Sequence, residues 1–76
     1  MEEVIAILNE IRPGQKFSTA ENLFDEGVLD SLDLTTLVAA LEQRYGVFID
    51  VDEIVAENFR NLAAIKEVLA AKGVKL

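Results

Sequence analysis

The feature that most limits the possible folds is an apolar stripe at helical spacing in the middle of the chain. In residues 31–45, apolar side chains recur every three or four positions, and at about 100° per residue they fall on one face of a helix. Gly46 follows directly, at a position where many helices end. We expect a helix over 31–45 with the core side chains Leu34, Leu37, Val38, Leu41 and Tyr45.

A first, shorter helix is predicted over residues 2–11, because its apolar side chains recur with the same period. Pro13 and Gly14 stop it. Between residues 12 and 30 the period fades, which leaves a long loop for so small a chain. Loops of this length serve a function or are held by their own side chains. The helix stripe consists of Val4, Ile7, Leu8 and Ile11, and the side chains that could hold the loop are Phe17, Leu23, Phe24 and Leu29.

The C-terminal part of the chain predicts two more helices. Asp52 can cap a short helix over about 53–57, and Asn61 can cap a longer one over 62–72, which Gly73 follows. The stripe of this last helix consists of Leu62, Ile65 and Leu69.

The apolar run Val47-Phe48-Ile49 could form a strand, but no second strand is predicted to pair with it. We therefore expect an extended connection packed on the core. The predicted fold is all-α: a small four-helix bundle of three longer helices and one short helix, with a long loop between the first two. Further core residues are expected at Phe24, Phe48, Ile49, Phe59 and Leu62.

Length and composition exclude several classes of function. The 76 residues are enough for one domain, 1–76, with a thin core and no deep catalytic cleft. Without Cys or His, the chain has no disulfide, zinc site or Ser-His nucleophile of its own. A net charge of −7 disfavours nucleic acid and anionic membranes and favours partners with basic patches.

The same composition predicts where the protein works. No apolar run is long enough for a membrane span, and the acidic start Met1-Glu2-Glu3 differs from a basic secretory signal. We expect a cytoplasmic protein. We also expect a monomer, because a net charge of this size is sufficient to keep a small domain soluble and monomeric.

Asp30, Ser31 and Leu32 mark the start of the middle helix. A hydroxyl at this position meets unpaired backbone N–H groups and the positive end of the helix dipole, which favour a bound phosphate. The structural alternative is that Ser31 simply caps the helix. Leu32 lies on the side of the helix away from the apolar stripe, beside Thr36 and Ala39, so it is available to a partner.

The segment Gly27-Val28-Leu29-Asp30-Ser31-Leu32, followed by the stretch 37–42, resembles the phosphopantetheine attachment region of acyl carrier proteins. The resemblance continues through Tyr45-Gly46-Val47 to the stretch 57–62, and it covers nearly the whole domain in the right order and spacing. The Asp-Ser-Leu match alone is short. Together with the surrounding helices it is specific.

The resemblance implies that Ser31 receives 4′-phosphopantetheine from coenzyme A through a phosphopantetheinyl transferase. The thiol of that arm then carries an acyl or aminoacyl group as a thioester, and the protein itself is a carrier, not an enzyme. Partners would be the transferase, loading ligases or transferases, and synthases of fatty-acid, polyketide or related biosynthesis, through basic docking patches. The implied partner contacts are Asp30, Leu32, Asp33, Thr36, Ala39 and Glu42.

Departures from the fatty-acid type keep other carriers open. Fatty-acid carriers are often acidic at three positions that here hold Thr36, Gln43 and Arg44. A glycine four residues before the serine, as Gly27 is, makes the chain more similar to carriers of secondary metabolism and to peptidyl or D-alanyl carriers. From another class, the chain could be a helical interaction module without a prosthetic group. A calcium module ranks third, because Val55 stands where the loop from Asp50 requires glycine.

Overall fold

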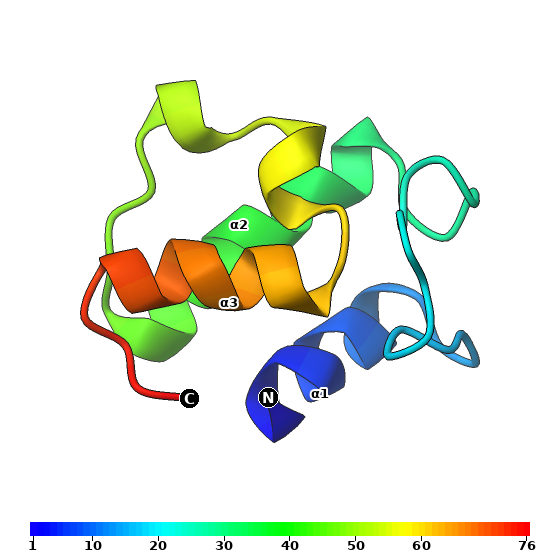
Figure 1. Cartoon of the computed structure of the whole chain (residues 1–76), viewed down its shortest axis with the longest axis horizontal. Helices are drawn as coiled ribbons and strands as arrows, with labels where there is room; N and C mark the ends of the chain where they lie inside the picture. Colours follow the sequence, from blue (N-terminus) through cyan, green and yellow to red (C-terminus); the bar gives the residue numbers. More distant parts are fainter.

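A computed structural model describes residues 1–76 (Figure 1), and it is entirely helical. Three α-helices, α1 (Glu2–Ile11), α2 (Ser31–Tyr45) and α3 (Leu62–Ala71), are joined by loops that contain two short 3-10 turns, η1 (Val51–Glu53) and η2 (Ala56–Phe59). The all-α prediction is confirmed, as are the bounds of the first two helices. None of the helices has the length and apolar character that crossing a membrane requires.

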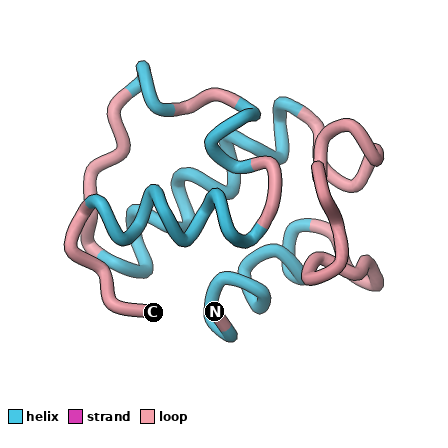
Figure 2. The backbone as a smooth tube through the Cα atoms, viewed as in Figure 1, coloured by secondary structure: helices cyan, strands magenta, loops and turns pink.

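Helix α2 is the central element of the fold. Helix α1 packs against it, the turn η2 packs against it as well, and α3 packs against η2 (Figures 1 and 2). Between these elements lies a core that contains no polar or charged residue. The buried residues are Val4, Leu8, Phe17, Leu23, Leu29, Leu34, Leu37, Val38, Leu41, Ile49, Phe59, Ala64, Ile65 and Leu69.

The C-terminal end of α2 is set by Gly46. This glycine adopts φ 63° and ψ 34°, in the left-handed region, and its N–H donates to the carbonyl of Glu42 at 2.9 Å. A residue with a Cβ rarely takes this conformation, so the glycine ends the helix where the sequence predicts. Four of the five predicted core residues of α2 are buried, and Tyr45 is half-buried.

The predicted helix over 53–57 is wrong. Two 3-10 turns take its place, and the first begins after Asp50, not Asp52. The reason is the Glu53 side chain, which reaches back to accept the N–H of Asp50 at 2.9 Å and is held from the other side by Lys72 Nζ at 2.8 Å. These contacts close a tight turn over three residues. The last helix ends at Ala71, one residue earlier than predicted.

Phe48 was predicted to lie in the core, and the structure places it outside with 72% of its surface exposed. Its neighbours Val47 and Ile49 do pack against the core. Successive side chains of an extended segment point to opposite sides, so three consecutive apolar residues cannot all face the same core. The segment forms neither helix nor strand, in agreement with the prediction of a connection.

The long loop between α1 and α2 is held by apolar side chains, as predicted: Phe17, Leu23 and Leu29 are buried and Phe24 is half-buried. Polar contacts that the pattern does not predict hold it as well. The Asn22 side chain accepts the N–H groups of Phe24 and Asp25, at 3.0 and 3.1 Å. The loop therefore approaches α2 in a defined shape.

Two hydrogen bonds join this loop to the segment before α3. The N–H of Leu23 donates to the carbonyl of Arg60 at 2.6 Å, and the Asn61 side chain donates to the carbonyl of Glu21 at 3.0 Å. Asn61 also caps α3, since its side-chain oxygen accepts the N–H of Ala64 at 2.9 Å. One residue thus fixes the start of α3 and the loop that leads to α2.

Candidate functional site

Ser31 is the first residue of α2, and its side chain is exposed. Its hydroxyl makes no hydrogen bond within the chain. The N-cap is Asp30, whose carboxylate accepts the N–H of Asp33 at 2.9 Å, so the alternative in which Ser31 caps the helix is wrong. Because Asp30 occupies the N-cap position, the cap comes from the residue before Ser31 and the serine hydroxyl is left free.

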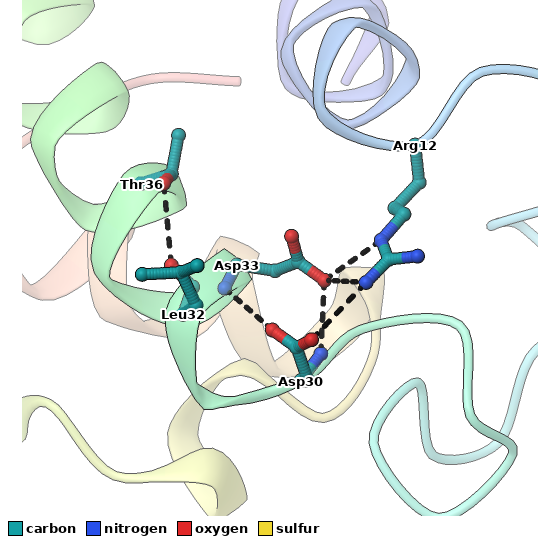
Figure 3. A network of polar contacts seen from close by, with 5 residues as sticks. All are labelled: Arg12, Asp30, Leu32, Asp33 and Thr36. Atoms are coloured by element: carbon teal, nitrogen blue, oxygen red, sulfur yellow. Dashed lines mark hydrogen bonds and ion pairs between the residues drawn. The ribbon is translucent and has the colours of Figure 1, made fainter.

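Asp30 and Asp33 enclose Ser31 and Leu32 in a reciprocal capping box (Figure 3). Asp30 Oδ1 accepts the N–H of Asp33, and Asp33 Oδ2 accepts the N–H of Asp30 at 3.0 Å. The carbonyl of Asp30 accepts the N–H of Leu34 at 3.0 Å. These bonds satisfy helix-start donors and fix the first turn of α2.

Arg12, at the end of α1, binds both carboxylates of the box (Figure 3). Its Nε and Nη2 each lie 2.8 Å from Asp33 Oδ2, and Nη2 lies 3.2 Å from Asp30 Oδ2. The sequence pattern does not indicate this role of Arg12, because Asp33 is 21 positions away along the chain. One signal was present: Arg12 and Lys16 are the only basic residues before Ser31.

The two partners shift one another's titration. Partial burial by itself raises the pKa of Asp33, but the hydrogen bond from Arg12, the N–H of Asp30 and the charge of Arg12 outweigh it and hold that pKa below its ordinary value. The hydrogen bond to Asp33 and its negative charge raise the pKa of Arg12. The pair therefore stays ionised over a wider range of pH than isolated side chains would.

The structure predicts that the protein loses stability in acid. The pKa of Asp33 is lowered, and a hydrogen bond from Lys72, with the N–H of Asp50, lowers the pKa of Glu53. A carboxylate with a lower pKa in the folded state stabilises it above the unfolded pKa, about 4, and this contribution is lost as the pH falls through the folded pKa. Urea unfolding at pH 7 and pH 3 should show a lower free energy of unfolding at pH 3.

Asp33→Asn is the matched variant for that measurement. It removes one of the two carboxylates whose pKa is lowered and keeps a side chain that can form hydrogen bonds. Its loss of stability between pH 7 and pH 3 should be smaller than that of the wild type. An equal loss in the variant would contradict the contribution of Asp33, and no loss in either protein would contradict both assignments.

The predicted partner contacts differ in how far their side chains are exposed and in whether they are hydrogen-bonded within the chain. Leu32 has 75% of its surface exposed, and Thr36 and Ala39 are exposed as well. The side chain of Asp30 is 60% exposed, whereas that of Asp33 is 14% exposed. Glu42 is half-buried, and its carboxylate accepts the N–H of Ile49 at 2.9 Å.

The loop that leads into Ser31 is closed by a pair of backbone bonds. The N–H groups of Val28 and Leu29 both donate to the carbonyl of Leu23, at 2.9 and 3.0 Å. Gly27 adopts φ 74°, which a glycine takes without strain. Together with the buried Leu29 side chain, this turn sets the direction in which the chain enters α2.

The residues at the start of α2 fit a phosphate ester on Ser31. The hydroxyl is exposed, and the N–H groups of Ser31 and Leu32, in the first turn of a 15-residue helix, have no acceptor within the chain. Free N–H groups at the positive end of a helix dipole stabilise a phosphate there. Asp30 and Asp33 lie close by, but Arg12 offsets part of their negative charge.

The residues that begin like a calcium loop are engaged within the chain. The carboxylate of Glu53 is bound to Lys72 and to the N–H of Asp50. No group of three or more acidic side chains is placed to hold a metal ion.

Comparison with known proteins identifies the family of the chain. Residues 2–69 match the family described as phosphopantetheine attachment site, and this range includes α1, α2, the loop between them and α3 up to Leu69. Searches of the curated proteins and of the solved structures found no match. Members of that family carry 4′-phosphopantetheine and work with transferases and synthases. The exposed serine at the start of α2 and the match over 2–69 lead to one conclusion: this chain belongs to the phosphopantetheine attachment family and is a carrier domain.

Proposed function

We propose that this chain is an acyl carrier protein and that its 4′-phosphopantetheine arm is attached to Ser31. The observation that supports this choice of residue is its position: an exposed, unbonded hydroxyl at the first residue of α2, where two backbone N–H groups are free. The chain has one other serine, Ser18, in a turn of the loop between α1 and α2.

In the attachment step, Ser31 Oγ forms a bond to the phosphorus that bears pantetheine in coenzyme A. The pyrophosphate bond of coenzyme A breaks, and the nucleotide leaves with the other phosphate. The hydroxyl proton passes to a base of the transferase, because Ser31 has no hydrogen-bonded base of its own in this chain. Once attached, the group supplies a terminal thiol on a flexible arm, and the cargo is held there as a thioester.

The chain itself presents the attachment point and a surface for partners. Leu32, Thr36 and Ala39 form an uncharged exposed face on α2, and we propose that this face lies against partner enzymes. Asp30 adds an exposed carboxylate beside it. Asp33 and Glu42 complete the proposed contacts, but their carboxylates are already hydrogen-bonded within the chain and have less to offer a basic patch.

An aminoacyl carrier, of the D-alanyl or peptidyl type, is the second candidate. The uncharged face of α2 favours it. Fatty-acid carriers are often acidic at the positions of Thr36 and Gln43, and this chain is not. In either case the chain is a cosubstrate of other enzymes and not itself an enzyme, and we propose that it works as a monomer in the cytoplasm.

The test is intact mass before and after incubation with coenzyme A and a broad-specificity phosphopantetheinyl transferase, followed by peptide mapping. One added phosphopantetheine on the peptide that contains Ser31 is expected. Offering the labelled protein to ligases with fatty acids, amino acids or D-alanine then separates the two cargo classes. No added mass, while a control carrier is labelled normally, would favour an interaction module without a prosthetic group.

Leu32→Ala should reduce the rate of labelling much more than the stability of the fold. Exposed side chains change the free energy of unfolding by about 0.5 kcal/mol or less, whereas an apolar contact at the centre of an interface is worth over about 1 kcal/mol, or fivefold in kcat/KM. Steady-state labelling and urea unfolding measure the two effects.

The matched control for Leu32→Ala is Leu34→Ala, two positions along the same helix. Leu34 is buried, so its truncation should cost about 2–5 kcal/mol of stability. A comparable loss of stability in both variants would contradict the exposed position of Leu32. Unchanged kcat/KM in Leu32→Ala would contradict its role in docking.

A further inference from the structure

Arg12 joins two parts of the chain whose relative position decides where Ser31 lies. It stands directly after α1, and its guanidinium reaches the first turn of α2, where it contacts the carboxylates on either side of Ser31 and Leu32 (Figure 3). Nη1 makes no contact with either carboxylate, so all of the bonding to the box comes from Nε and Nη2.

The capping box at this helix start has an unusual charge. Capping boxes usually pair Ser or Thr with Glu or Gln, whereas here both members are aspartates, so two negative charges lie within one turn. One oxygen, Asp33 Oδ2, accepts hydrogen bonds from the N–H of Asp30 and from Arg12 Nε, and Arg12 Nη2 forms an ion pair with the same oxygen. Without the guanidinium, repulsion between the two carboxylates would oppose the reciprocal bonds that hold the turn closed.

We propose that Arg12 is a positioning residue for the modification of Ser31. It offsets part of the negative charge of Asp30 and Asp33 and thereby keeps the first turn of α2 closed, with the Ser31 hydroxyl where the transferase meets it. This inference rests on the proposed function, in which Ser31 is the attachment point. The residue acts through the two aspartates and takes no part in the bond that forms.

Arginine suits this position better than lysine. Its planar guanidinium offers two donors from one edge, and Nε and Nη2 use that edge against a single carboxylate oxygen while Nη2 also reaches Asp30. A lysine ammonium keeps the positive charge but lacks the two donors in fixed, planar geometry. Arg12→Lys should therefore restore part of what Arg12→Gln removes.

The experiment measures kcat and KM of a phosphopantetheinyl transferase for the wild type, Arg12→Gln, Arg12→Lys and Arg44→Gln. Arg44 is the matched control, because it pairs with Glu3 and so also joins α1 to α2, but at the far end from Ser31. We expect Arg12→Gln to lower kcat/KM about three- to tenfold, mainly through kcat, as for the loss of a partly exposed, charge-assisted contact. Arg12→Lys should lie between, and Arg44→Gln should match the wild type.

Amide hydrogen exchange gives a second, independent measurement on the same proteins. The N–H groups of Asp33 and Leu34 bond to Asp30, so they should exchange faster in Arg12→Gln and at the wild-type rate in Arg44→Gln. Circular dichroism verifies that each variant is folded, and Arg12→Lys provides a conservative variant if Arg12→Gln is not.

Three results would overturn the inference while leaving Ser31 as the attachment point. One is an Arg12→Gln variant labelled as fast as the wild type, and another is an equal loss in Arg44→Gln, which would mean only that the two helices must be held together. The third is faster labelling of Arg12→Gln, since Arg12 would then shield Asp30 from the transferase. A wild-type chain that is never labelled would instead refute the proposed function, and this inference with it.

Discussion

Ser31→Ala is expected to abolish attachment of 4′-phosphopantetheine while leaving the protein folded. Alanine has no oxygen to form the phosphodiester, so the loss should be complete and not a reduction in rate. The Ser31 side chain is exposed and makes no hydrogen bond within the chain, and the helix cap comes from Asp30. The free energy of unfolding should therefore change by about 0.5 kcal/mol or less.

Ser18→Ala is the matched control, because it removes the only other serine of the chain. It should be labelled as the wild type is, as measured by intact mass and peptide mapping after incubation with coenzyme A and the transferase. Label on Ser31→Ala, or loss of label in Ser18→Ala, would contradict the assignment of Ser31. A Ser31→Ala protein that unfolds would show that the residue is structural.

Phe59→Ala is expected to destabilise the fold more than other single truncations. Phe59 lies at the end of η2, is fully buried, and belongs to the core between α2 and α3. Truncating a buried phenylalanine costs about 3–5 kcal/mol. A domain of this size has a total stability of roughly 4–11 kcal/mol, at about 0.05–0.15 kcal/mol per residue. A large part of the Phe59→Ala protein should thus be unfolded under mild conditions.

Phe48→Ala provides the matched control for Phe59→Ala, since it is the same substitution at a side chain that is 72% exposed. Its free energy of unfolding should lie within about 0.5 kcal/mol of the wild type. Urea unfolding followed by circular dichroism measures both variants. Equal losses at the two positions would contradict the outward position of Phe48, and a small loss at Phe59 would contradict its place in the core.

Local sequence signals determine some elements of this fold, and contacts between distant residues determine others. Helices α1 and α2 and the end of α2 at Gly46 were predicted to the residue, because helical periodicity and a glycine stop are local signals. The short turns around Asp50 were not, since the contact of Glu53 with Lys72 spans 19 positions and selects a tighter turn than the local pattern predicts. Phe48 was misplaced because an apolar residue in an extended segment gives no sign of which way it points.

The sequence alone was sufficient for the class of fold, the position of Ser31 at a helix start and the outward direction of Leu32. These depend on residues within a few turns of one another, where spacing and residue type carry the information. The role of Asp30 as the cap and the clamp of Arg12 on Asp30 and Asp33 emerge only in the folded chain. The cap is a local contact, but aspartate and serine are both preferred N-cap residues, so the pattern does not decide between Asp30 and Ser31. The contacts of Arg12 join residues 18 and 21 positions apart, and they exist only after core packing has brought the end of α1 to the start of α2.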